Sequence, residues 1–263
     1  MGDVMLSPAT SKLGRRYGYR PPREYHRLLM GLRHLGQGGA IDDPSLKVSW
    51  RTLMRPPRDQ GAEGSCFAHT VAALKEANCV FWEMNKGGPP TPLGGYLSVA
   101  YLSWRTRLAE GTFPDDSGAS ISDAMAVLQA YGVCPEAFLP YDQDPTQAGN
   151  AKCDVAARPY RIHEPVGVQI DPAAWRAVLL AKKVIAIGFE VHQSFEETGL
   201  DGVVPPVQPG EPLLGGHAML VVGWDPGRGF EMRNSWGESW GSGGHCYFPE
   251  AYLSNVIEAL STA

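Results

Sequence analysis

The sequence has no long apolar run, no excess of basic residues and no Cys-x-x-Cys pair. Its best apolar stretch, residues 178–187, is interrupted by Lys182 and Lys183 and is shorter than the roughly 18 residues that cross a bilayer, so no membrane partner is expected. The 23 basic and 28 acidic residues give a formal net charge of −5, which is too weak to predict a nucleic-acid partner. No zinc knuckle is indicated, and no metal or other cofactor is expected.

The N-terminus and the cysteine content bear on the compartment. Residues 1–16 hold no continuous apolar stretch of the secretory kind and turn basic at Arg15 and Arg16, so no signal peptide is expected. Five cysteines are an odd number, and at least one thiol must stay free. Both observations fit a reducing, cytoplasmic setting.

Of the 263 residues 43% are hydrophobic, which is sufficient for a sizeable core. The composition changes along the chain. Residues 1–43 are rich in Arg, Tyr, Pro and Gly, with one short helix predicted over residues 23–35. Further helices are predicted over residues 66–84, 96–108, 121–131 and 172–181, and strands over residues 184–189, 218–222 and 246–248. A helical first half and a sheet-rich second half predict an α+β protein with a seam between two lobes, where a cleft is a common ligand site.

Cys66 is the cysteine that lies at the start of a predicted helix, just after a polar, glycine-bearing turn. Unpaired backbone N–H groups and the helix dipole favour a thiolate there, which makes Cys66 the candidate nucleophile. The other four are expected to be structural thiols: Cys79 inside a helix, Cys134 after a helix end, Cys153 in a polar loop and Cys246 in a strand.

Seven histidines could act as its base. His69 lies three residues after Cys66 on the same helix, which leaves no second lobe to present a substrate between them. His217 lies between two glycines and an apolar strand, and Asn234 lies in a turn. Taken alone, each of these two is more often structural, but they follow Cys66 by 151 and 168 residues in the order Cys, His, Asn, which is typical of papain-like enzymes.

The local sequences around these positions resemble the papain-like cysteine peptidases, and the bacterial or phage members in particular. The matching stretches are residues 59–61 with 64–68, residues 216–218 with 221–223, and residues 234–237 with 240–241. Residues 48–51 resemble the start of the mature enzyme, and residues 132–136 with 140–142 resemble the middle of bacterial members. The resemblance runs from about Pro44 to Leu253. It implies a helical left lobe over about residues 58–160, a β-barrel-like right lobe over about 161–263, and an active-site cleft between them.

The resemblance also implies a cysteine-type endopeptidase that cuts peptide or protein substrates through a thioester acyl-enzyme. In this family pattern Cys66 attacks the scissile carbonyl, His217 moves the proton and Asn234 orients the imidazole. Gln60 matches the side chain that donates to the oxyanion, together with the backbone N–H of Cys66.

Six further residues match the family's substrate groove. Gly118 and Ala119 stand where the family pairs with the peptide backbone, and the small Gly216 and Ala218 predict an open pocket for an apolar side chain. Trp236 resembles the indole that shields the His–Asn contact, and Trp240 the one that lines the leaving-group side. For both tryptophans, plain core packing is the alternative.

The chain departs from secreted members of the family at two disulfides. Glu63 and Asp116 stand where the first bridge has its cysteines, and Cys153 resembles half of a second bridge whose partner is missing near Arg105. The loss of both partners together predicts an intracellular enzyme of a bacterium or a phage-infected cell, without disulfides.

Three questions stay open at this level. Residues 1–43 are either an inhibitory pro-segment or a permanent arm packed across the lobes, and the arm is preferred because the segment is short and lacks a long helical pattern. The chain could also be a catalytically silent binding or assembly module, although its complete triad and Gln60 count against that reading. Other acyl transfers on Cys–His chemistry, such as transglutamination or peptidoglycan amide cleavage, lack the Gln60 and Asn-Ser-Trp-Gly context.

Overall fold

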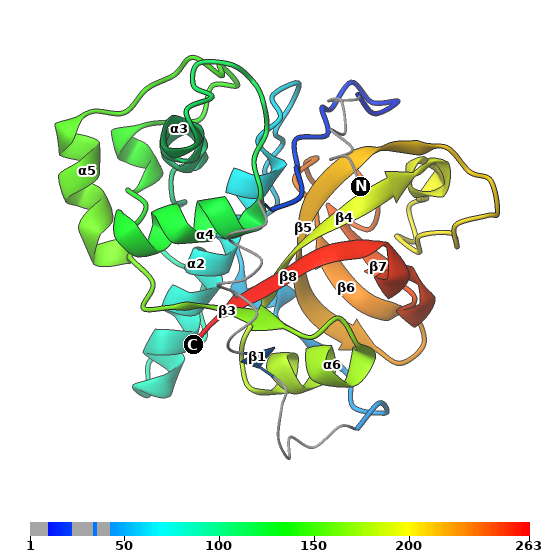
Figure 1. Ribbon diagram of the computed structural model, residues 1–263. Coiled ribbons are helices and arrows are strands. Elements are labelled where there is room, and N and C mark those ends of the chain that lie inside the picture. The colour runs from blue at the N-terminus through cyan, green and yellow to red at the C-terminus, as the bar shows by residue number, and fades with distance from the viewer. Residues whose placement is uncertain (1–9, 23–33, 36–42) are drawn as a thin grey trace.

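The structure is a computed structural model that describes residues 10–22, 34–35 and 43–263 (Figure 1). Four helices gather on one side of the molecule and most strands on the other, which confirms the α+β class. The α-helices are α2 (Cys66–Asn85), α3 (Val99–Glu110), α4 (Ile121–Ala130), α5 (Ala151–Ala157) and α6 (Pro172–Leu180). The strands are β1 (His34–Leu35), β2 (Val48–Ser49), β3 (Pro165–Val168), β4 (Ile185–His192), β5 (Leu213–Asp225), β6 (Gly229–Arg233), β7 (His245–Phe248) and β8 (Val256–Thr262). Short 3-10 helices are η1 (Arg51–Leu53), η2 (Glu136–Phe138), η3 (Arg158–Tyr160), η4 (Gln193–Glu197) and η5 (Glu250–Asn255).

Helix α2 is the central element of the helical side, because most of its first sixteen residues are buried whichever way they face. Its neighbours begin where a serine hydroxyl satisfies a free backbone N–H: Ser98 accepts from Tyr101 at α3, and Ser120 accepts from Asp123 at α4. These caps explain why α3 begins three residues later than predicted, at Val99. Cys66 is therefore held at the N-terminus of a helix that packing fixes on all sides.

The sheet has the order β1-β3-β8-β4-β5-β6-β7, with β2 pairing onto β5. All pairings are antiparallel except β1 with β3. Within the described residues the sheet is open, with β1 and β7 at its edges, so the barrel-like lobe implied by the resemblance is a curved sheet that does not close.

Strand β5 joins the two halves of the core. Its side chains alternate between faces, so Ala218, Leu220 and Val222 pack with the helical side, while Met219 and Val221 pack inside the sheet side. Because helix α2 packs against β5, the start of α2 and the first half of β5 meet at the seam between the two cores.

Three local predictions need correction. The helix predicted over residues 23–35 lies mostly outside the described residues, and its last two residues form strand β1, paired in parallel with β3. Cys153 lies in helix α5 and is buried, not in a polar loop, because Asn150 caps a short helix there. Strands β6 and β8 were not predicted. In the part of the chain that the structure describes, no helix is both long and apolar enough to cross a membrane.

Candidate active site

Cys66 is fully buried at the first turn of α2. Burial raises the pKa of its thiol to about 12, although hydrogen bonds from the backbone of Gly18, Ala218 and Phe67 lower it. The lowered pKa expected from the helix terminus is thus not found in this structure, because desolvation outweighs the backbone donors. Since Ala218 follows His217 on β5, its contact brings the thiol to the strand that carries the histidine.

His217 and Asn234 form a buried pair. The His217 Nε2 and Asn234 Oδ1 atoms are 2.8 Å apart, and the same oxygen accepts the backbone N–H of Ser235 at 2.8 Å. Because that oxygen is an acceptor, Nε2 carries the proton and Nδ1 is the basic nitrogen. Nδ1 is buried and makes no hydrogen bond with the described residues. Burial lowers the pKa of His217 to about 4, against the contribution of Asn234, so the imidazole is neutral.

Aromatic rings surround this imidazole. The Trp236 ring centroid lies 5.1 Å from that of His217 and Phe189 lies at 5.8 Å, while Trp240 stacks edge-on against Trp236 at 5.3 Å. Both tryptophans are buried. Trp236 thus packs directly against the imidazole, whereas Trp240 lies one ring further out and lines an open cavity of about 300 Å³ together with Leu200.

Gln60 is held rigidly with its amide pointing towards a peptide carbonyl. Its Oε1 accepts the Ser235 hydroxyl at 2.7 Å, and its Nε2 donates to the backbone oxygens of Glu63 and Arg16, both at 2.8 Å. Arg16 belongs to residues 10–22, which we call the N-terminal segment. The side chain predicted to bind an oxyanion thus already holds a carbonyl of the chain itself.

The N-terminal segment lies in the seam between the helices and the strands (Figure 1). The Tyr19 N–H donates to the Gly216 oxygen at 3.0 Å, the Arg20 N–H donates to the Ala119 oxygen at 3.1 Å, and the Ala119 N–H donates to the Gly18 oxygen at 3.0 Å. Tyr19 pairs with Ala119 in parallel. The segment therefore occupies the groove residues that the sequence predicted for a substrate.

Gly18 lets the segment pass close to the nucleophile. A Cβ atom at this position would lie 1.9 Å from the backbone oxygen of Gly64, a contact that real atoms do not make. The sequence predicted a pro-segment or an arm across the lobes but not this close approach at Gly18, although one signal was available: basic and aromatic residues flank a single glycine over residues 15–20.

Tyr19 fills the pocket that Gly216 and Ala218 predicted. A Cβ at Gly188 would lie 2.0 Å from the Tyr19 ring, so the glycine makes room for it. At the far end of the pocket, Glu258 accepts the backbone N–H groups of Ile121 at 3.2 Å and Ser122 at 2.9 Å, and Tyr19 interacts with its carboxyl group. Burial raises the pKa of Glu258 to about 7. The pocket is apolar along its walls but ends in a carboxyl group.

Polar contacts brace the turn before Cys66 where the resemblance has a disulfide. The Gly64 N–H donates to the Asp116 carboxylate at 3.0 Å, and buried Glu63 accepts the Ser103 hydroxyl at 2.8 Å and lies 3.4 Å from the Arg107 guanidinium. All five cysteines are free. Hydrogen bonds thus brace this turn through Gly64 and Asp116 and, separately, through Glu63 and helix α3.

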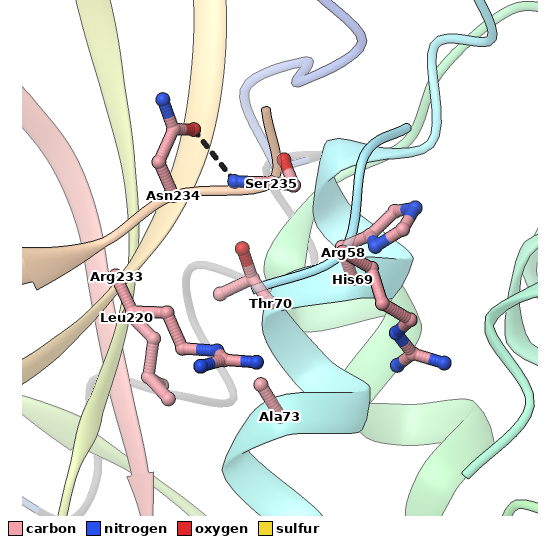
Figure 2. Close-up of a pocket in the computed structure, with 8 residues that line it drawn as sticks. All are labelled: Arg58, His69, Thr70, Ala73, Leu220, Arg233, Asn234 and Ser235. Carbon is pink, nitrogen blue, oxygen red and sulfur yellow. Dashed lines mark hydrogen bonds between the residues drawn. The ribbon is translucent and has the colours of Figure 1, made fainter. Parts of the chain in front are cut away.

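A small cavity of about 10 Å³ lies between α2 and the end of β6, and Asn234 and Ser235 are among the residues that line it. Figure 2 shows these residues. Arg58, His69 and Arg233 line it, and the space is large enough for about one water molecule. His69 packs edge-on against Tyr141 with ring centroids 4.9 Å apart. Burial and the charges of Arg58 and Arg233 lower the pKa of His69, which makes it a poor proton acceptor.

Comparisons with known proteins identify relatives of this chain. A family model described as papain family cysteine protease matches residues 109–257. An uncharacterised peptidase C1-like protein of Acanthamoeba polyphaga mimivirus is 30% identical over 209 residues, which cover 75% of this chain and 65% of that protein. A gut-specific cysteine proteinase of Caenorhabditis elegans is 24% identical over 210 residues, covering 71% and 61%. The chain thus spans less than two thirds of the length of these two relatives.

Solved structures match over nearly the whole chain. The crystal structure of xylellain, a cysteine protease from Xylella fastidiosa, matches with a TM-score of 0.81 at 28% identity, covering 98% of this chain and 97% of that one. The digestive procathepsin L 3 of Tenebrio molitor matches with a TM-score of 0.64 at 19% identity, covering 99% and 83%, and supports the fold alone.

Proposed function

This chain belongs to the papain family of cysteine proteases, and from that premise we propose that it is a cysteine endopeptidase whose catalytic residues are Cys66, His217, Asn234 and Gln60. The observation that carries the proposal is the contact between the Gln60 amide and the backbone oxygen of Arg16 at 2.8 Å. A peptide carbonyl already sits on the proposed oxyanion donor, beside a thiol at a helix N-terminus.

The reaction follows from the protonation states of the site. Nδ1 of His217 takes the thiol proton, since Nε2 keeps its own proton on Asn234. The thiolate attacks the scissile carbonyl carbon, and Gln60 stabilises the oxyanion, a donor worth about 3 kcal/mol in comparable sites. The imidazolium then protonates the leaving amine, which breaks the C–N bond and leaves a thioester on Cys66. Water, deprotonated by His217, hydrolyses the thioester.

The N-terminal segment keeps this site closed in the proposed resting state. Gly18 presents a backbone N–H to the sulfur, so the segment itself contacts the proposed nucleophile. The segment also holds the oxyanion donor and the Tyr19 pocket. These contacts support an inhibitory role for residues 10–22 within the predicted 1–43 arm.

A glycine substitution tests both parts of the proposal. In the full chain, Gly18→Ala places a methyl group against the Gly64 oxygen and should expel the segment from the cleft. Gly94→Ala is the matched control, because a Cβ there meets nothing within 4 Å. We expect Gly18→Ala to cleave a diverse peptide mixture at least about tenfold faster than the wild type, and Gly94→Ala to match the wild type.

The Cys66→Ala/Gly18→Ala double variant should cleave nothing. A folded Gly18→Ala protein that neither cleaves peptides nor reacts with a vinyl sulfone at Cys66 would show a silent binding module instead. If the wild type and Gly18→Ala cleave peptides at equal rates, the segment is not inhibitory, but the peptidase function stands.

A further inference from the structure

The charges of the N-terminal segment have one sign. Residues 10–22 hold four basic side chains and no acidic one. Each basic side chain meets a carboxylate outside the segment, and the four ion pairs are Lys12–Glu197, Arg15–Asp59, Arg16–Asp116 at 2.9 Å and Arg20–Glu110. The two tyrosines repeat the pattern, since Tyr17 donates to Glu196 and Tyr19 interacts with Glu258.

The carboxylates that receive these groups come from both sides of the cleft. Glu110 and Asp116 lie on the helical side, Glu196 and Glu197 lie on η4 beside the strands, and Asp59 precedes the oxyanion donor. We call these five residues the acidic track. The track extends along the segment on both sides of Gly18, which lies at the sulfur.

Displacement of the segment changes the charge of the cleft strongly. Residues 1–22 carry four basic residues and one acidic residue, a net of +3 against a total of −5, which leaves −8 on the rest of the chain. Some of these carboxylates are far from water in the closed state: the Glu110 side chain is 3% exposed and that of Asp116 is 12% exposed. Carboxylates that lose their cations in such a site favour a ligand that replaces those cations.

We propose that the acidic track selects cationic peptides, rich in Lys and Arg, as the substrates of this cleft. The inference rests on the proposed peptidase function for its chemistry but on the ion pairs of the segment for its selectivity. It does not depend on the direction in which a substrate lies, because carboxylates line both sides of the nucleophile. Charge of this sign also speeds the encounter with a cationic peptide at low ionic strength.

Turnover of matched peptides by the full-chain Gly18→Ala variant tests the selectivity. Three peptides share one tyrosine-containing core and differ only in flanking Lys and Arg, Gln, or Glu residues. We expect kcat/KM for the basic peptide to exceed that for the Gln peptide by roughly tenfold at low salt, and to approach it near 1 M NaCl, where screening is strong. Equal rates for the basic and Glu peptides would overturn the proposal.

A pair of charge variants separates the track from net charge. Glu110→Gln/Glu197→Gln removes two carboxylates of the track, whereas Glu83→Gln/Asp144→Asn removes two exposed carboxylates elsewhere. The first pair should lower the preference for the basic peptide by about threefold or more, and the second should leave it unchanged. If both double variants lose the preference for the basic peptide equally, the preference is a general effect of net charge, which would contradict the proposal.

Binding of the same peptides to Cys66→Ala/Gly18→Ala, measured by fluorescence anisotropy, needs no catalysis. Tighter binding of the basic peptide supports the acidic track even if the peptidase function fails. If this variant binds the basic and Glu peptides equally, and Gly18→Ala with Cys66 intact cleaves both, the selectivity proposal is wrong but the peptidase function stands.

Discussion

Two buried histidines lie near Cys66, but their surroundings differ. His69 follows it by three residues on α2, and His217 lies on β5 next to Ala218, which contacts the thiol. His217 bonds a neutral amide oxygen through Nε2 and keeps Nδ1 without a partner among the described residues. His69 lies in the cavity of Figure 2 with Arg58 and Arg233, whose charges lower its pKa beyond the effect of burial. Burial lowers the pKa of both imidazoles, but the neighbours of His69 are cations, whereas His217 is the histidine that we propose as the partner of the Cys66 thiolate. Proximity in the sequence therefore does not identify the base.

The largest expected effect separates the two histidines directly. In the Gly18→Ala background, His217→Ala should lower kcat/KM by about a thousandfold or more, because the thiol loses its proton acceptor. His69→Gln in the same background should stay within about threefold, since the His69 ring packs edge-on against Tyr141 and His217 is the smallest of the causes that lower its pKa. Steady-state kinetics on one peptide measure both. Equal losses in the two variants would erase the distinction.

The arginine side of the comparison predicts a change in stability. Arg233 donates to the backbone oxygens of Arg55 at 2.6 Å and Pro56 at 2.9 Å. Arg233→Met leaves these oxygens without their donor and should lower the free energy of unfolding by about 3 kcal/mol, measured by urea denaturation. The pKa of His69, followed by NMR, should rise because one facing cation is gone. An unchanged pKa of His69 would mean that burial alone keeps this histidine neutral.

The hydrogen bond between His217 and the Asn234 amide predicts a smaller loss of activity. In the Gly18→Ala background, Asn234→Ala removes the acceptor of the His217 Nε2 proton and frees the ring to rotate. We expect kcat to fall by roughly tenfold to a hundredfold with KM little changed, since the change acts on orientation and not on peptide binding. If instead KM rises and kcat holds, Asn234 contributes to the groove and not to the base.

Acid stability gives the smallest effect. The pKa of His217 is lowered to about 4 in the folded state, while an unfolded histidine titrates near 6.5. Between those values the unfolded chain binds more protons, so stability is full above about pH 6.5 and falls as the pH drops towards 4. Glu258, whose pKa is raised to about 7, acts in the opposite direction between about pH 7 and 4.5.

The His217→Gln and Glu258→Gln variants isolate these two contributions. Denaturant unfolding across pH 4 to 7 should show a shallower fall for His217→Gln, by at most about 1.4 kcal/mol per pH unit, and a steeper fall for Glu258→Gln. Parallel profiles for wild type and both variants would contradict the buried, neutral states assigned to them.

Local patterns predicted most of the elements that frame the site. Helix α2, strand β5 and the turns around Asn234 follow from apolar runs bounded by polar or glycine residues, which are local signals. Strands β6 and β8 were missed because buried charges interrupt their patterns: Glu231 and Arg233 in the first and Glu258 in the second. Those charges are satisfied by partners distant in the sequence, which no local pattern reveals.

The residues proposed as catalytic could be predicted from sequence, but the contacts that hold the N-terminal segment in the cleft could not. Gln60, Cys66, His217 and Asn234 lie in short motifs whose order carries the information. The position of Gly18 against Gly64 depends on the fit between two distant backbones. The helix terminus alone predicts a lowered pKa for the Cys66 thiol. In the structure burial raises that pKa, and the hydrogen bond from Gly18 offsets only part of the rise.

The pH dependence of Cys66 alkylation by iodoacetamide, a neutral reagent, tests the central claim most directly. In Gly18→Ala, we predict rapid alkylation well below pH 7, because His217 stabilises the thiolate, and its loss in His217→Ala. The wild-type chain should react slowly over the same range while Gly18 lies at the sulfur. A single titration near the ordinary thiol pKa in Gly18→Ala, unchanged by His217→Ala, would contradict the account.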